Sequence, residues 1–169
     1  MKFILVAFLA IACSSVGPGG YRSTGLEDRV TNSDIIAIVK IAAIDEEYKM
    51  SDLISQFYST AQVAEFIKGG RGEHTFKFIT NGLTPSRNPS CCENGQTYLI
   101  FGSYGYPVLE TDQNMEDYFV MEETDKFVSP ADGPYSAFRI VDGYVEGWDP
   151  SNSPPRLETV VSAIRKYMN

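Results

Sequence analysis

The side chains of this sequence that could carry covalent or acid–base chemistry include three cysteines and a single histidine. Cys91 and Cys92 are adjacent and precede an apolar stretch, and Cys13 follows an apolar run at the start of the chain. A reactive cysteine needs an exposed thiolate, which the negative charge of Glu93 disfavours. We interpret His74 as a surface residue. Since neither Gly-x-Ser-x-Gly nor His-Glu-x-x-His occurs, the sequence predicts no catalytic residues.

One acidic segment has the spacing of a calcium loop. Asp112, Asn114, Glu116 and Glu123 occupy positions one, three, five and twelve of such a loop. The sixth position, which should be glycine, is Asp117, and neither flank has a helical pattern. We therefore interpret the segment as an acidic hairpin and predict neither a metal site nor a cofactor.

The first twelve residues have the features of an export signal. Lys2 precedes an unbroken apolar run over residues 3–12, and small residues follow. As a helix this run would extend only roughly 15 Å, about half of the hydrocarbon thickness of a bilayer. A signal peptide over 1–12 is therefore a better interpretation than a membrane-spanning helix.

The residues before Cys13 indicate how the signal ends. The segment "LAIAC" resembles the lipobox of bacterial lipoproteins, although Ala10 stands where that motif usually has leucine. This resemblance implies that the Cys13 thiol receives a diacylglyceryl group and that acyl chains, such as palmitate, hold the protein on a membrane of the bacterial cell envelope. "AIA" is also an ordinary cleavage site, which would release a secreted or periplasmic protein instead.

Composition limits the partners and the organisation of the chain. The net charge is −8, and removal of Lys2 with the signal makes the remainder more acidic, so no general attraction for nucleic acid is expected. Residues 13–31 are small, polar and turn-prone, which predicts a flexible tether after the lipidated cysteine. Residues 32–169 are long enough for a single domain.

The hydrophobic pattern of this domain is mainly that of β-strands. The first expected strand is apolar on both faces, as in a strand buried on each side. Strands are expected over residues 34–44, 57–66, 74–80, 97–102 and 106–111, with a loop over 45–55. An Asp142-Gly143 turn predicts a later hairpin. An apolar stripe then predicts a C-terminal helix, and its members are Leu157, Val160, Val161, Ile164 and Tyr167.

Several of these segments together resemble a known family. "NSDIIAIVKI", "VAEFIKG", a loop containing "TP" and the pattern Cys-x-x-x-Gly-x-x-Tyr-Leu-Ile-Phe-Gly resemble, in this order, the OB-fold module of netrin-like domains, which include tissue inhibitors of metalloproteinases. The resemblance implies a mainly β protein with a five-stranded OB-fold Greek-key barrel over 32–112. Residues 113–169 are then a C-terminal extension with extra strands and a packed helix.

The chain departs from this family in its cysteines. In netrin-like domains the cysteine before "YLIFG" usually pairs with one on the next strand, but residues 106–119 contain none. Cys91 and Cys92 are left with each other or with Cys13. If Cys13 is lipidated, the pair either stays free or closes a vicinal disulfide, which an oxidising compartment favours.

These features predict a binding protein rather than an enzyme. We expect a lipoprotein that binds an envelope or extracellular protein, and the tyrosines of "FGSYGYP", Tyr104 and Tyr106, are the candidate contact residues. They could equally pack in the core. One alternative, implied by the family resemblance, is a secreted metallopeptidase inhibitor that uses an N-terminal Cys13 to chelate zinc. A third is an envelope hydrolase.

Overall fold

The computed structural model describes residues 25–49, 55–81, 91–111, 117–122, 124, 126–149 and 152–168. The helices in these parts are α1 (Leu26–Asn32), the 3-10 helix η2 (Gly133–Ser136) and α2 (Leu157–Lys166). The strands are β1 (Ile35–Lys49), β2 (Ser55–Lys68), β3 (Thr75–Asn81), β4 (Thr97–Tyr104), β5 (Tyr106–Thr111), β6 (Asp117–Glu122), β7 (Phe127–Pro130), β8 (Ala137–Val141) and β9 (Tyr144–Val145).

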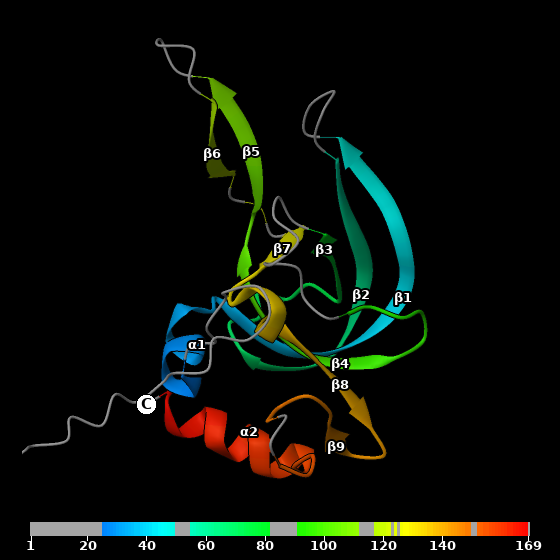
Figure 1. Ribbon diagram of the computed structural model, residues 1–169, viewed down its shortest axis with the longest axis vertical. Helices are drawn as coiled ribbons and strands as arrows, with labels where there is room; N and C mark the ends of the chain where they lie inside the picture. The colour runs from blue at the N-terminus through cyan, green and yellow to red at the C-terminus, as the bar shows by residue number, and fades with distance from the viewer. Residues whose placement is uncertain are drawn as a thin grey trace, which may run out of the picture.

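Five of the strands form a closed ring. Their order is β1-β2-β3-β7-β4, and a pairing of β4 with β1 closes the ring (Figure 1). β3 and β7 are parallel, and the other pairs in the ring are antiparallel. β8 and β9 extend the sheet outside the ring, next to β4. The expected fold is therefore confirmed: a mainly β, OB-like barrel with extra strands and a C-terminal helix.

The fifth strand of the ring is not the one expected from the sequence. The segment 106–111 is β5, which pairs with β6 outside the ring, whereas β7 inserts between β3 and β4. The ring therefore extends beyond the expected boundary of 32–112. β7 can pack closely against β4 because Gly102 has no side chain; a Cβ there would overlap the Val128 side chain.

The first two strands are longer than predicted. The expected loop over 45–55 is largely wrong, because β1 continues to Lys49 and β2 begins at Ser55. β1 pairs with β4 only over residues 35–40, so its second half continues beyond the ring with β2 as its partner. Several register shifts interrupt the β1–β2 pairing, and such bulges bend and twist strands. The curvature of this pair is visible in Figure 1.

The double-sided burial predicted for the first strand has a clear structural cause. Ile35, Val39 and Ile41 belong to the cluster that fills the barrel, together with residues of β2, β3, β4 and β7. Ile36 belongs to a second cluster outside the ring, which includes α2 and β8. β1 therefore separates two cores, which explains why both of its faces are apolar.

The C-terminal helix covers the outer cluster. Val160, Val161 and Ile164 of α2 are buried as predicted, but Tyr167 is 45 % exposed and lies outside the apolar stripe.

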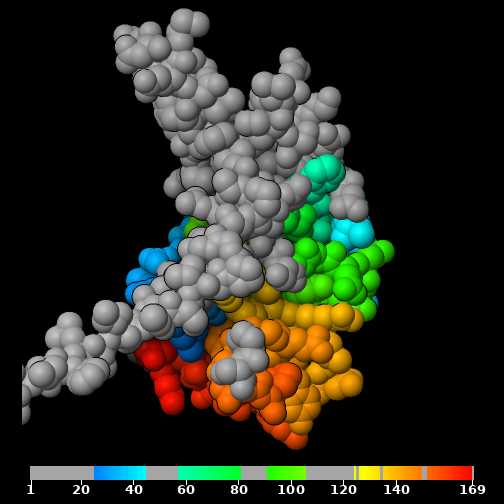
Figure 2. Space-filling view, viewed as in Figure 1, coloured from blue at the N-terminus to red at the C-terminus, as the bar shows by residue number. Residues whose placement is uncertain are grey.

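The predicted Asp142-Gly143 turn joins β8 to β9, and both of its residues have positive φ. Figure 2 shows α1 and α2 adjoining at the end of the molecule opposite the β5–β6 hairpin of Figure 1. None of the helices in the described ranges is long and apolar enough to cross a membrane.

The last part of the expected tether is folded. α1 begins at Leu26 within the predicted tether of 13–31, and Arg29 and Val30 are buried. Acidic residues in its first turn suit the helix dipole. A seven-residue helix is marginal alone, so its packing against the domain is what stabilises it. The sequence pattern could not predict that residues 26–32 fold as a helix on the domain, because a main partner of α1, Asp132, lies 103 residues further along the chain.

Candidate functional sites

A cavity of about 460 Å³ is lined by residues of β4, β8 and η2 and of the segments that precede β4 and follow β9. This volume is within the range of small-molecule sites. Its lining residues are Glu93, Tyr98, Tyr135, Ala137, Phe138, Arg139, Glu146 and Gly147. Strands and a 3-10 helix supply most of them, so the walls are held by the ordered part of the fold.

Arg139 is the cationic residue of this cavity. It lies on β8 opposite Tyr98 of β4 in the sheet register. One terminal nitrogen is 3.6 Å from a carboxylate oxygen of Glu93, and the Arg139 and Glu93 side chains are 36 % and 65 % exposed. Arg139 Nε is buried and has no hydrogen-bond acceptor among the described residues. A buried donor without an acceptor is costly, so this nitrogen favours a ligand or water oxygen.

Tyr98 places a hydroxyl at the cavity. Its side chain is only 2 % exposed, and its hydroxyl oxygen accepts a hydrogen bond from the Glu93 backbone N–H at 3.1 Å. Because a phenol can donate as well as accept, the O–H of Tyr98 still has a proton to donate, and no acceptor for it is found among the described residues. The same bond fixes the backbone of Glu93 at the edge of the cavity.

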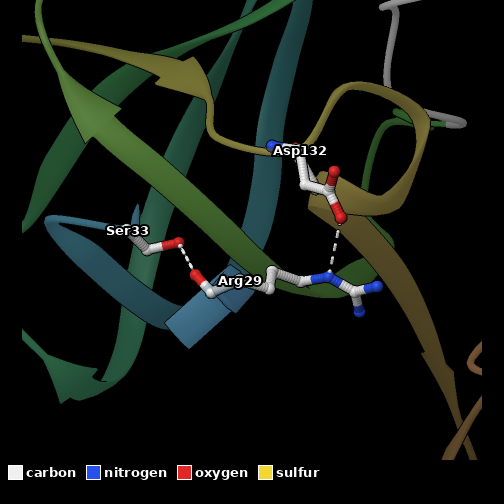
Figure 3. A network of polar contacts seen from close by, with 4 residues as sticks. Arg29, Ser33 and Asp132 are labelled. Atoms are coloured by element: carbon white, nitrogen blue, oxygen red, sulfur yellow. Dashed lines mark hydrogen bonds and ion pairs between the residues drawn. The ribbon is translucent and has the colours of Figure 1, made fainter. Parts of the chain in front are cut away.

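A buried ion pair supports the η2 wall of the cavity. Arg29 Nε donates to a carboxylate oxygen of Asp132 at 3.1 Å, and the two residues are 7 % and 2 % exposed (Figure 3). Ser33 donates to the carbonyl of Arg29, and Asp132 N–H donates to Ser136 Oγ. The ion pair thus joins α1 to the residue that precedes η2.

Aromatic rings surround the same guanidinium. The Arg29 guanidinium carbon lies 5.2 to 5.8 Å from four ring centroids, a distance at which cation–π attraction is effective. These rings belong to Phe101, Tyr135, Phe138 and Trp148. Tyr135 and Phe138 also line the cavity, so their packing against Arg29 restrains two of the lining residues.

The paired cysteines directly precede Glu93, a lining residue of the cavity, in the sequence. The sulfurs of Cys91 and Cys92 are at disulfide-bond distance, and both residues are half-buried against the barrel core. The described part of the chain contains no group of three His, Cys, Asp or Glu residues arranged to hold a metal ion.

Tyr104 is a core residue rather than a surface contact. It is 6 % exposed and belongs to the barrel cluster. Its hydroxyl lies 2.9 Å from the Gly69 carbonyl and is hydrogen-bonded to the Glu73 carboxylate, while the Arg71 guanidinium lies 4.1 Å from the ring centroid. Tyr104 therefore attaches the β2–β3 turn to the end of β4. The interpretation of this residue as a candidate partner contact is not supported by its burial.

We expect Tyr104→Phe to change the alkaline stability of the protein. Burial, followed by the hydrogen bond to Glu73, raises the pKa of the Tyr104 hydroxyl above its usual value near 10. Above that pH the unfolded chain loses this proton first, so the free energy of unfolding falls as pH rises. Tyr104→Phe should weaken this fall and also cost about 1–3 kcal/mol at neutral pH through the lost hydrogen bond.

Urea unfolding between pH 7 and 11.5 measures this effect. Tyr167→Phe, at an exposed tyrosine, is the control and should reproduce the wild-type curve. Parallel pH curves for wild type and Tyr104→Phe would show that Tyr104 does not contribute to the alkaline loss.

Tyr106 lies at the start of the hairpin outside the ring. In the sheet register it pairs with Glu122, and β5 and β6 form a two-stranded sheet of their own. In Figure 1 this hairpin and the far half of β1–β2 project from the ring in the same general direction. Each strand of a two-stranded sheet has one edge without a partner within that sheet.

The remaining candidate residues are either at the surface or outside the described residues. His74 is exposed, and its carbonyl accepts from Val63 N–H, in agreement with a surface interpretation. Cys13 lies outside the described residues. Four positions of the considered calcium loop also lie outside them, namely Asp112, Asn114, Glu116 and Glu123.

Sequence reasoning did not identify the cavity residues. Arg139 lies in "FRIV", the segment just before the Asp142-Gly143 turn, where the predicted hairpin indicates a strand but no site. Tyr135 follows Gly133-Pro134, an ordinary turn signal. The lone charge within an apolar strand is the one signal that could have indicated Arg139. Glu146 had no distinguishing pattern.

In comparisons with known proteins, no protein-family model and no curated protein matches the chain.

Proposed function

We propose that the protein is a non-enzymatic lipoprotein of the bacterial cell envelope whose barrel binds a partner protein. Cys13 is the proposed site of lipid attachment, and residues 32–169 are the proposed netrin-like binding domain. The membrane is then the first partner, through the acyl chains, and an envelope or extracellular protein is the second. No cofactor enters this proposal.

The observation that carries the protein-binding role is the position of the β5–β6 hairpin. It forms a two-stranded sheet outside the ring, and an isolated hairpin of this kind is only marginally stable in water. An extended segment of another protein can pair with an open strand edge through main-chain hydrogen bonds. We therefore propose strand addition at β5 or β6, close to Tyr106.

Site-specific photo-crosslinking in intact cells tests this role. A photoreactive phenylalanine analogue replaces Tyr106 in one strain and Tyr167, on the helical side of the molecule, in a control strain. We expect a discrete crosslinked protein adduct from position 106 and none from position 167. No adduct from position 106, or the same adducts from both positions, would contradict binding at the hairpin.

A further inference from the structure

We propose that the cavity between β4, β8 and η2 binds a neutral saccharide. This inference goes beyond the proposed protein partner, since it concerns β4, β8 and η2 and does not require the β5–β6 hairpin to bind anything. It rests on the charges, the hydrogen-bonding groups and the apolar surface of the cavity.

The charges of the lining favour an uncharged ligand. The cavity contains one cation, Arg139, and two carboxylates, Glu93 and Glu146. An anionic ligand that approached Arg139 would meet both carboxylates, and an ammonium ligand would meet the guanidinium. A neutral ligand with many hydroxyl groups avoids both repulsions.

The polar groups of the cavity complement hydroxyl groups. Arg139 supplies donors, including a buried Nε without an acceptor in the described structure, and Tyr98 supplies an O–H. Glu93 and Glu146 supply acceptors. A sugar hydroxyl both donates and accepts, so neighbouring hydroxyls can satisfy Arg139 and a carboxylate together. A hydrocarbon ligand would leave these groups unpaired, which is costly.

The remaining wall is apolar and restrained. Tyr135, Ala137 and Phe138 line the cavity. Tyr135 is partly exposed and can contact the C–H face of a sugar ring, whereas Ala137 and Phe138 are only 4 % and 3 % exposed. Both aromatic rings contact the Arg29 guanidinium, which is itself paired with Asp132. A wall held in this way loses little side-chain freedom on binding, which favours affinity.

The single tryptophan of the chain provides a direct readout. The Trp148 ring centroid lies 4.9 Å from that of Phe138, which lines the cavity. The full-length protein in detergent is titrated with glucose, galactose, mannose and N-acetylglucosamine, and with glucuronate and glucosamine as charged counterparts. Tryptophan fluorescence gives the Kd, and saturation-transfer NMR confirms contact with the sugar protons.

We expect at least one neutral sugar to bind with a Kd on the order of millimolar, and tighter than glucuronate or glucosamine. Arg139→Lys keeps the charge but removes the guanidinium donors, and should weaken binding about tenfold or more. Tyr167→Ala, at an exposed tyrosine away from the cavity, is the control and should bind as wild type. Thermal unfolding checks that each variant is folded.

Replacing both carboxylates tests the charge selection separately. Glu93→Gln/Glu146→Gln should weaken binding of the neutral sugar, but less than Arg139→Lys does, because an amide oxygen still accepts hydrogen bonds, though weaker ones than a carboxylate, and it should gain binding of glucuronate. The proposal is overturned if none of the four neutral sugars binds, if glucuronate binds wild type equally well, or if Arg139→Lys binds as wild type. None of these results depends on crosslinking at Tyr106.

Discussion

Asp132→Ala is expected to lower the free energy of unfolding by about 3–5 kcal/mol, because it leaves the buried Arg29 guanidinium without its carboxylate. The aromatic rings around Arg29 attract a cation but accept no conventional hydrogen bond from it. Urea unfolding at neutral pH measures the loss. Hydrogen exchange should also show faster opening of α1, since the pair joins this helix to η2.

The chain offers an exposed ion pair as a matched control. Arg165 and Glu65 lie 3.2 Å apart, with side chains 60 % and 50 % exposed. Glu65→Ala should cost less than about 1 kcal/mol, since solvent screens such pairs. The double variant Arg29→Met/Asp132→Ala removes both buried charges and should be more stable than Asp132→Ala alone. Equal losses in Asp132→Ala and Glu65→Ala would contradict the proposed role of the buried pair.

Gly69→Ala is expected to destabilise the barrel by about 3 kcal/mol or more. Gly69 has φ of 69°, and a Cβ at this position would overlap the carbonyl oxygen of Asp34. A backbone oxygen at the start of β1 cannot move without disturbing the pairing of the strand, so overpacking adds to the cost of a positive φ. Thermal and urea unfolding give the loss.

Gly72→Ala separates the two contributions. Gly72 also has a positive φ, 92°, but nothing lies within 4 Å of a Cβ built there. This variant should lose only about 1–2 kcal/mol, the cost of a left-handed conformation. If Gly69→Ala and Gly72→Ala were equally stable, the close approach of Gly69 to Asp34 would contribute nothing measurable.

The parts of the fold that were predictable have local patterns. β1 is apolar on both faces because it lies between two cores, and α2 buries Val160, Val161 and Ile164 at helical spacing. The Asp142-Gly143 turn was predictable because glycine accepts the positive φ that a two-residue turn needs. Each of these features depends on residues close together in the sequence.

The parts that were not predictable depend on long-range contacts. Arg29 and Asp132 are 103 residues apart, and nothing in the turn-prone segment around Arg29 indicates a partner. β7 has only four residues, too few for a clear period-two pattern, yet it joins β3 to β4 in the ring. The burial of Tyr104 was not predictable either, because its hydroxyl contacts the Gly69 carbonyl, which is 35 residues away in the sequence.

The cavity could not have been predicted for the same reason. Glu93, Arg139 and Glu146 come from three segments, and only the pairing of β4 with β8 and of β8 with β9 brings them together. Their residue types are ordinary at a protein surface. What distinguishes them is a shared concave surface, which a sequence does not display.

Intact-mass and N-terminal analysis of the protein recovered from the membranes, the periplasm and the medium of a bacterial culture tests the lipoprotein proposal most directly. We expect a mature chain that begins at Cys13, with a diacylglyceryl group on its sulfur and no free thiol at that residue. A chain with an unmodified Cys13 thiol and an open amino terminus, recovered from the medium or the periplasm, would contradict the lipoprotein and make the metallopeptidase inhibitor the leading alternative.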